Sequence, residues 1–216
     1  MMIKKIVTAS ILVCCSIAST AQAALQGRDL NGSIDSFEAY YDTVLDITWL
    51  DVNSGAMGQE AAYWATSLSI VDAVNNNTYD NWRLPTTLQP DASCDSQPAG
   101  GSSGYFCNGS EMGHLFYSEL GGTAGLSILT SADPDLAKFT NLQAFYYWSG
   151  TEYAPNTGYA WTFRLSGGYQ TVAGKSNGLY ALAVSPGDVA AVPEAETYAL
   201  MLAGLGLIGW RMRRRG

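Results

Sequence analysis

The stretch YAWTFRL, residues 159–165, decides how the later half of this 216-residue chain folds. A large apolar side chain stands at every second position, and smaller or polar side chains lie between. This period of two predicts a β-strand with one face in the core. The next residues, SGG at 166–168, are typical of a turn, and YQTV at 169–172 resumes the strand pattern. We therefore expect two strands that fold back on each other.

Strand patterns also occur before and after this pair. The segment FEAYYDTVLDITWLD, residues 37–51, predicts two short strands around a turn at Asp42 to Asp46. Two further strands are expected at AFYYWSG, residues 144–150, and at LYALAV, residues 179–184.

Apolar residues at helical spacing predict two helices between these strands. The stripe of the first helix comprises Met57, Ala61, Trp64, Leu68 and Val71. In the second, Ser110 is the expected N-cap and Gly121 the expected end. Helices and strands mix without repeats, so we expect a single α+β domain over residues 24–190.

The N-terminus has the three parts of a secretory signal peptide over residues 1–23. Lys4 and Lys5 precede an apolar run, and Ala21-Gln22-Ala23 is typical of a cleavage site. A lipoprotein anchor at Cys14 or Cys15 is the alternative, although the residues before these cysteines suit it poorly. We therefore expect an exported protein.

Cleavage of that peptide would leave two cysteines, Cys94 and Cys107. In an exported chain, two cysteines most simply form one disulfide. The loop between them is rich in Gly, Ser and Pro and has no apolar pattern of its own. A redox or catalytic cysteine pair is the alternative.

The body of the chain is acidic. Between residues 24 and 192, five Lys and Arg stand against seventeen Asp and Glu. Such a surface repels phosphate backbones, so we expect no nucleic-acid partner. Cations and neutral sugars remain possible ligands.

The C-terminal stretch GLGLIG, residues 204–209, fits the dinucleotide fingerprint G-x-G-x-x-G letter for letter. That fingerprint needs a preceding strand, a following helix and an acidic residue about 20 positions later. Here seven residues follow, and four of them are arginines. The stretch therefore predicts no nucleotide site, and we expect no cofactor.

The same stretch belongs to an uncharged segment, residues 197–210, that predicts a short transmembrane helix. Such a segment rises only about 21 Å, less than the roughly 30 Å hydrocarbon core, and so predicts a marginal anchor. The arginines that follow hold its end in the cytoplasm by the positive-inside rule. The acidic body then lies on the far side of the inner membrane.

This tail, residues 191–216, resembles the PEP-CTERM sorting signal. The matching positions are Pro193, Glu194, Ala195, Arg213, Arg214 and Arg215, with alanine where the motif usually has its second proline. The resemblance implies that an exosortase in the inner membrane cleaves near Pro-Glu and passes the product to the cell surface or matrix of a Gram-negative bacterium. The alternative is an ordinary single-span anchor that is never processed.

The body resembles the DUF1566 family, also called the Lcl C-terminal domain. The matching segments are YYDTVLDITWLDVN, NWRLPT, SEMGHLFYSELG, FTNLQAFYYWSGTEYA and LYALAVSPGDV, in family order. WRLPT at 82–86 and YWSGT at 147–151 are the most specific. The resemblance implies a C-type-lectin-like α+β fold, and some relatives bind glycans on cell surfaces.

Catalytic and metal motifs in the body are incomplete. His114 is the only histidine, so Glu111-x-x-His114 lacks the second pair that a di-iron site needs. We expect a structural histidine bonded to a neighbouring loop, and no metal site. Ser102 lies in a G-x-S-x-G match, but no strand precedes it, so we expect no catalytic serine.

Three residues are the candidates for ligand binding: Trp82, Arg83 and Tyr153. An arginine can stack on an aromatic ring and donate paired hydrogen bonds, and a tyrosine can stack on a sugar ring. The alternative for Arg83 is that it ties two loops together. Asp51 and Asn53 are a weaker hint of calcium.

Together these patterns predict a non-enzymatic exported protein, sorted by exosortase, that binds exopolysaccharide or serves as a matrix component. An enzyme acting on envelope glycans is the alternative.

Overall fold

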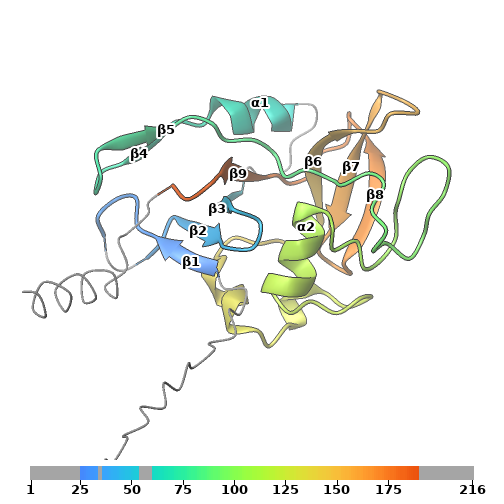
Figure 1. Cartoon of the computed structure of the whole chain (residues 1–216), viewed down its shortest axis with the longest axis horizontal. Coiled ribbons are helices and arrows are strands. Elements are labelled where there is room, and N and C mark those ends of the chain that lie inside the picture. Colours follow the sequence, from blue (N-terminus) through green and yellow to red (C-terminus); the bar gives the residue numbers. More distant parts are fainter. Residues whose placement is uncertain (1–24, 34–35, 54–59, 190–216) are drawn as a thin grey trace, which may run out of the picture.

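Antiparallel strands form most of the secondary structure in the computed structural model of the chain, which describes residues 25–33, 36–53 and 60–189 (Figure 1). The expected α+β class is confirmed, with two short helices beside the sheets. The predicted signal peptide, residues 1–23, and the sorting tail with its predicted transmembrane helix lie outside the described residues. Within the described ranges, no helix has the length and apolar character needed to cross a membrane.

One sheet has four strands in the order β1-β2-β3-β9. Its members are β1 (Leu25–Arg28), β2 (Ala39–Asp42), β3 (Ile47–Asn53) and β9 (Leu182–Pro186). The predicted strand pair of residues 37–51 is β2 and β3, which pair from Ala39 with Leu50 to Asp42 with Ile47. Asp46 ends the turn between them with a φ of 52°, a left-handed conformation that aspartate tolerates.

The second sheet has three strands in the order β6-β7-β8. They are β6 (Tyr146–Glu152), β7 (Tyr159–Arg164) and β8 (Tyr169–Gly174). The YAWTFRL stretch is thus the central strand, and its antiparallel pairing with β8 is confirmed. Trp161, Phe163 and Leu165 are buried, whereas Tyr159 at the start of the strand is exposed.

The segment before β9 joins the two sheets. Tyr180 donates its backbone N–H to Tyr146 and accepts one from Trp148, so it pairs with β6. Val184, inside β9, exchanges backbone hydrogen bonds of 2.9 and 2.8 Å with Arg83. The predicted strand LYALAV therefore begins on one sheet and ends in the other.

Two apolar clusters lie on opposite faces of the segment of residues 181–184. Leu182 and Val184 pack with Met112 and Phe116 of the second helical segment, while Ala181 and Ala183 pack with a cluster that includes Ala61 of α1. In Figure 1, α1 (Glu60–Ser67) and α2 (Glu111–His114) accordingly lie on different sides of β9. The alternation of β9 thus places one helix on each face.

The first helix is shorter than predicted, and its predicted end at Val71 is wrong. α1 ends at Ser67, and Val71 is an exposed residue of the hairpin β4 (Ile70–Asp72) and β5 (Asn77–Tyr79). The Asp72 carboxylate accepts the backbone N–H groups of Val74 and Asn75 and so fixes the turn. Met57 lies outside the described residues.

The second helix changes type in the middle. α2 continues into η1 (Leu115–Glu119), a π-helical turn in which the Leu120 N–H donates to the Leu115 carbonyl at 2.9 Å. Gly121 follows with a φ of 61°, so the predicted end is confirmed. Ser110 occupies the N-cap position, but its side chain makes no cap hydrogen bond. It accepts from the Leu88 N–H instead.

Candidate functional site

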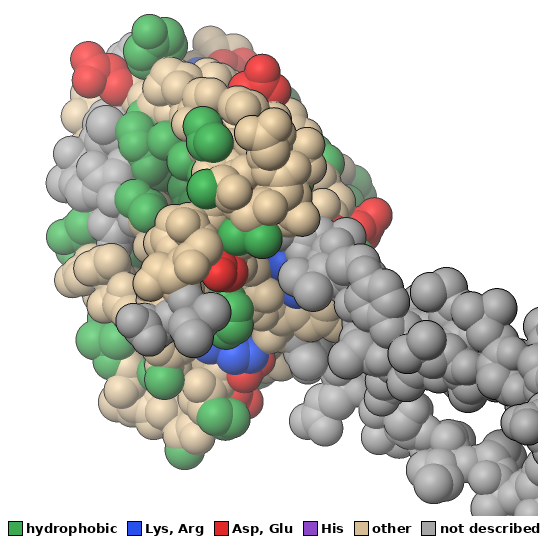
Figure 2. All heavy atoms as spheres, turned by 90° about the vertical axis from the view of Figure 1, so that its left-hand side faces the viewer, with side chains coloured by type: hydrophobic (Ala, Val, Ile, Leu, Met, Phe, Trp, Pro, Cys, Tyr) green, Lys and Arg blue, Asp and Glu red, His purple; other side chains and the backbone are tan. Residues whose placement is uncertain are grey.

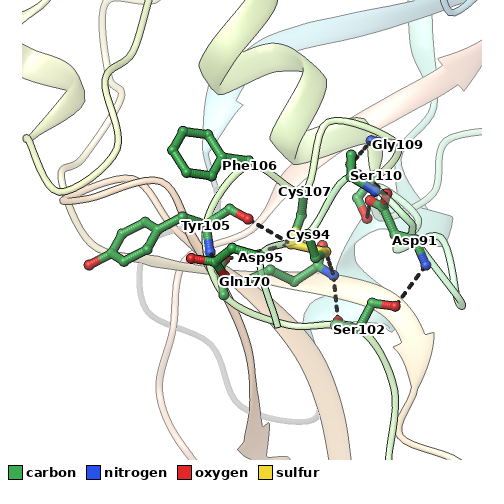
Figure 3. The surroundings of a disulfide bond; sticks show 12 residues. Asp91, Cys94, Asp95, Ser102, Tyr105, Phe106, Cys107, Gly109, Ser110 and Gln170 are labelled. Carbon is green, nitrogen blue, oxygen red and sulfur yellow. Dashed lines mark hydrogen bonds between the residues drawn. A yellow bond between two sulfur atoms is a disulfide. The ribbon is translucent and has the colours of Figure 1, made fainter. Parts of the chain in front are cut away.

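The predicted disulfide between Cys94 and Cys107 is confirmed. The loop that it closes has regular structure, although its composition predicted none. Ser96 and Ser103 exchange backbone hydrogen bonds of 3.2 and 2.9 Å across the loop. Gly104 then pairs with Gln170 of β8, so the loop extends the three-stranded sheet at its edge. Figure 3 shows Gln170 beside the disulfide.

Side-chain amides hold the middle of this loop in place. Gln89 accepts the Ser102 N–H at 2.6 Å and donates to the Ser102 carbonyl at 2.9 Å. The buried Ser102 hydroxyl donates to Gln97 at 2.6 Å. It also accepts the Asp91 N–H at 2.9 Å (Figure 3). Both hydrogen bonds of the Ser102 hydroxyl therefore stay within the segment of residues 91–102.

A groove runs between this loop and the β6–β7 turn. It has a volume of about 530 Å³ and joins a smaller hollow of about 130 Å³ through shared lining residues. We call the two together the disulfide-loop groove. The residues that define it are Gln97, Pro98, Gly100, Gly101, Thr151, Glu152, Pro155, Tyr153 and Trp161.

Aromatic rings form the wall of the smaller hollow. Tyr153 meets Trp161 edge to face, with ring centroids 5.7 Å apart. Gly100 and Gly101 allow the loop to lie against these rings. A Cβ on Gly100 would lie 2.2 Å from the Tyr153 hydroxyl oxygen, and one on Gly101 would lie 2.7 Å from the Trp161 ring. The loop glycines therefore set the width of the groove.

The groove is nearly neutral. Glu152 is the single carboxylate among its described lining residues, and it forms an ion pair with Lys175. Figure 2 views the other side of the molecule, the left-hand side of Figure 1, where Asp and Glu are scattered and few Lys or Arg appear. A neutral lining of hydroxyl, amide, backbone and aromatic groups suits an uncharged ligand that offers hydroxyls and apolar C–H faces.

The three predicted ligand-binding residues do not form one site. Tyr153 lines the groove. Trp82 is 1% exposed and belongs to the core, where its indole N–H donates to the Tyr79 carbonyl at 3.1 Å. Its ring therefore offers no free face to a ligand, and the prediction for Trp82 does not fit the structure.

Arg83 ties two segments together, which is the alternative that the sequence left open. Its guanidinium holds both carboxylate oxygens of Glu111, at 2.8 and 2.7 Å. Glu111 also accepts the Thr86 N–H at 2.7 Å. The Glu111-x-x-His114 pair therefore does not share a ligand, because Glu111 faces the WRLPT segment.

His114 contacts two carboxylates, one in its own helical segment and one at the end of β2. Its Nε2 lies 3.0 Å from Glu119 Oε1 and 3.5 Å from Asp42 Oδ2. The hydrogen bond that the His114 imidazole donates to Glu119 raises the pKa of His114, and so do the charges of both carboxylates, while burial lowers it. No sequence pattern predicted this cluster, because residues five apart do not meet on an α-helix.

The Asp51 carboxylate is hydrogen-bonded to Thr140. It accepts the Thr140 N–H, at 3.2 Å from Oδ1, and the Thr140 hydroxyl, at 3.0 Å from Oδ2. Burial raises the pKa of Asp51, and the hydrogen bonds from Thr140 partly counter that effect. Asp51 thus anchors the segment before β6.

The tail carries the chain's sorting information. The PEP-CTERM protein-sorting motif matches residues 191–215. The tail is a PEP-CTERM sorting signal. This motif implies export and processing at the membrane by an exosortase, in a Gram-negative bacterium. Recognition by exosortase during sorting follows from the same match.

The match covers only the tail and says nothing about the folded body. No curated protein matches the chain, and no solved structure does.

Proposed function

We propose that this PEP-CTERM protein is placed at the cell surface or in the extracellular matrix, where its folded body binds polysaccharide without transforming it. The observation that carries the proposal is the disulfide-loop groove, whose lining is neutral, partly aromatic and held by a disulfide. Sorting by exosortase explains how the body reaches polysaccharide outside the cell.

The size and chemistry of the groove support a sugar ligand. A volume of about 530 Å³ falls within the roughly 300–1,000 Å³ of small-molecule sites. The backbone of the Gly100–Gly101 segment and the ring of Tyr153 line the groove and can contact a ligand. Because Gln89, Gln97 and the disulfide fix the loop before any ligand arrives, binding need not order it.

A binding role fits this lining better than hydrolysis. Glycoside hydrolases use two carboxyl groups, roughly 5–10 Å apart, on either side of the bond that they cleave. Among the described residues of the groove only Glu152 carries a carboxylate, and Lys175 already pairs with it. The enzyme alternative therefore lacks its second carboxylate at this groove.

We also propose that the body belongs with the DUF1566, or Lcl C-terminal, domains and shares their C-type-lectin-like fold. The two most specific segments of that resemblance lie against each other. In WRLPT, Pro85 accepts the N–H of Gly150 from YWSGT at 2.9 Å. Just beyond, Thr87 and Thr151 exchange hydrogen bonds of 2.8 and 3.3 Å. Thr151 then lines the groove, so these segments support one of its walls.

The sorting step is tested by intact-mass analysis of the secreted protein from hosts with and without exosortase. We expect loss of everything beyond the Pro193–Glu194 region only in the host that has the enzyme. A C-terminus that is the same in both hosts would refute exosortase processing.

The binding step is tested with the exported protein on an array of neutral exopolysaccharides, read by bound fluorescence and by release of reducing ends. We expect binding without release, and at least a tenfold loss of affinity for Tyr153→Ala. Tyr63→Ala is the matched control, because Tyr63 is an exposed tyrosine of α1 that does not line the groove. Equal loss in both variants, or binding to no glycan, would overturn the proposal.

A further inference from the structure

A second cluster of functional groups is buried under the β2–β3 turn and does not line the groove. It consists of Asp42 at the end of β2, His114 at the end of α2 and Glu119 at the end of η1. Asp42 is 1%, Glu119 3% and His114 9% exposed. One ligand atom from each lies within 4.8 Å of the other two.

Backbone hydrogen bonds orient the Asp42 carboxylate toward His114. Asp42 Oδ1 accepts the N–H groups of Val44 and Leu45, both at 3.0 Å, which leaves Oδ2 toward His114. The Trp49 indole N–H lies 3.5 Å from the same Oδ2. Such outer contacts are what orient the ligands of metal sites.

The cluster is short of positive charge and of hydrogen-bond donors. Glu119 Oε2 is buried and has no hydrogen-bond partner among the described residues. Even a protonated His114 would neutralise only one of the two carboxylates that it faces. A buried carboxylate oxygen without a partner is costly and calls for an explanation such as an ion.

A divalent cation supplies the missing charge. With a neutral imidazole, two carboxylates and one divalent ion, the cluster has no net charge, and Glu119 Oε2 gains a partner. The distances from the imidazole to the two carboxylates also suit a bound ion. The imidazole nitrogen lies 3.0 and 3.5 Å from the two carboxylate oxygens, close to the roughly 3.3 Å between ligands of a tetrahedral site with 2.0–2.1 Å bonds.

We propose that Asp42, His114 and Glu119 bind one divalent transition-metal ion, with zinc the best fit. The donors are His114 Nε2, Asp42 Oδ2 and the Glu119 carboxylate, whose two oxygens complete four positions. The imidazole favours zinc over calcium or magnesium, which prefer oxygen ligands alone. Because the cluster is buried, the ion is structural and fastens the β2–β3 turn to η1. The lone histidine predicted no metal site, but two carboxylates supply the remaining ligands.

The test uses the untagged exported chain, purified without chelators and analysed by elemental mass spectrometry. We expect about one zinc per wild-type chain and a melting temperature that rises with Zn²⁺ but not with Ca²⁺. Glu119→Gln should reduce the zinc content at least tenfold. Asp135→Asn is the control, because it removes a carboxylate from the ion pair with Lys138, outside both the cluster and the groove, and it should leave the zinc content unchanged.

Cobalt(II) gives a readout that does not need a folded variant. Added to the metal-free wild-type chain, Co²⁺ should produce the visible absorption of a tetrahedral site, and Zn²⁺ should bleach it. A wild-type chain that holds no metal and shows neither the absorption nor a shift in melting temperature would overturn the proposal. So would a folded Glu119→Gln variant that retains its zinc.

Discussion

Glu119 lies five residues after His114, yet its Oε1 is 3.0 Å from the His114 Nε2. On an α-helix, residues five apart point in different directions. The π-helical turn η1 adds a residue to the turn, shown by the hydrogen bond from Leu120 N–H to the Leu115 carbonyl, and so brings the two side chains onto one face. π-Turns of this kind are frequent at functional sites.

Removing the imidazole should destabilise the fold strongly. His114→Ala leaves Asp42 and Glu119 buried without the group between them, so we expect the free energy of unfolding to fall by about 3 kcal/mol. His114→Gln, which keeps a donor, should lose less. Urea denaturation followed by tryptophan fluorescence measures both. A His114→Ala variant within about 1 kcal/mol of the wild type would contradict a role for the cluster in stability.

The Arg83–Glu111 pair should stabilise the fold, because the guanidinium donates to both carboxylate oxygens. Its side chains are partly buried, at 33% and 14% exposure. We expect Arg83→Ala to cost about 2 kcal/mol and Arg83→Lys about 1 kcal/mol, because lysine cannot hold both carboxylate oxygens in one plane. In a double-mutant cycle, Arg83→Ala with Glu111→Ala should cost less than the sum of the two single changes. Additive losses would show that the two side chains act independently.

Removing the disulfide should lower the free energy of unfolding. The bond closes a loop with a sequence separation of 13, for which the chain-entropy model gives about 3 kcal/mol. We expect the double variant Cys94→Ser, Cys107→Ser to lose about that much in urea denaturation. The wild type in reductant should shift toward the variant, and the variant itself should not respond to reductant. An oxidised wild type no more stable than the variant would disprove the effect.

Gly101 should tolerate no side chain. Its φ is +125°, and a Cβ would lie 2.6 Å from Gln89 Oε1 and 2.7 Å from the Trp161 ring. We expect Gly101→Ala to cost about 2–4 kcal/mol, from backbone strain and overpacking together. Gly125→Ala is the matched control, because Gly125 has a φ of +83° and nothing within 4 Å of its Cβ position. Thermal unfolding of the two variants separates the packing cost from the strain, and equal losses would rule out a packing role for Gly101.

The Asp51 carboxyl should make stability depend on pH. Burial raises its pKa, and hydrogen bonds from Thr140 lower it less. The folded chain then holds the Asp51 proton to a higher pH than the unfolded chain does. The contribution of Asp51 is therefore most favourable at low pH and is lost as the pH rises through its folded-state pKa.

We accordingly expect Asp51→Asn to gain stability relative to the wild type between about pH 3.5 and pH 7. Denaturation curves at several pH values measure the difference. Asp80→Asn, at an exposed position, is the control for the loss of one negative charge. A difference between Asp51→Asn and the wild type that is constant with pH would contradict the assignment.

Local patterns predicted strands β2, β3 and β6 to β9, the end of the second helix and the sorting signal. The alternation in residues 159–165 produced β7, because a period of two can bury one face of a strand only. The turn at Asp42 to Asp46 and the stop at Gly121 follow from backbone preferences of single residues. The sorting signal lies in one continuous stretch, residues 191–215, and is recognisable from that stretch alone.

Tertiary structure decided which side chains meet. Trp82 and Arg83 are adjacent in sequence, yet one lies in the core and the other binds Glu111. The groove that Tyr153 lines has as its other wall a loop that begins more than fifty residues earlier in the chain. The β2–β3 turn brings Asp42 to His114, and a π-turn that helical periodicity does not anticipate brings Glu119 there. These contacts join residues far apart in the chain, or out of phase with its local period, so their geometry exists only once the sheets and helices have packed.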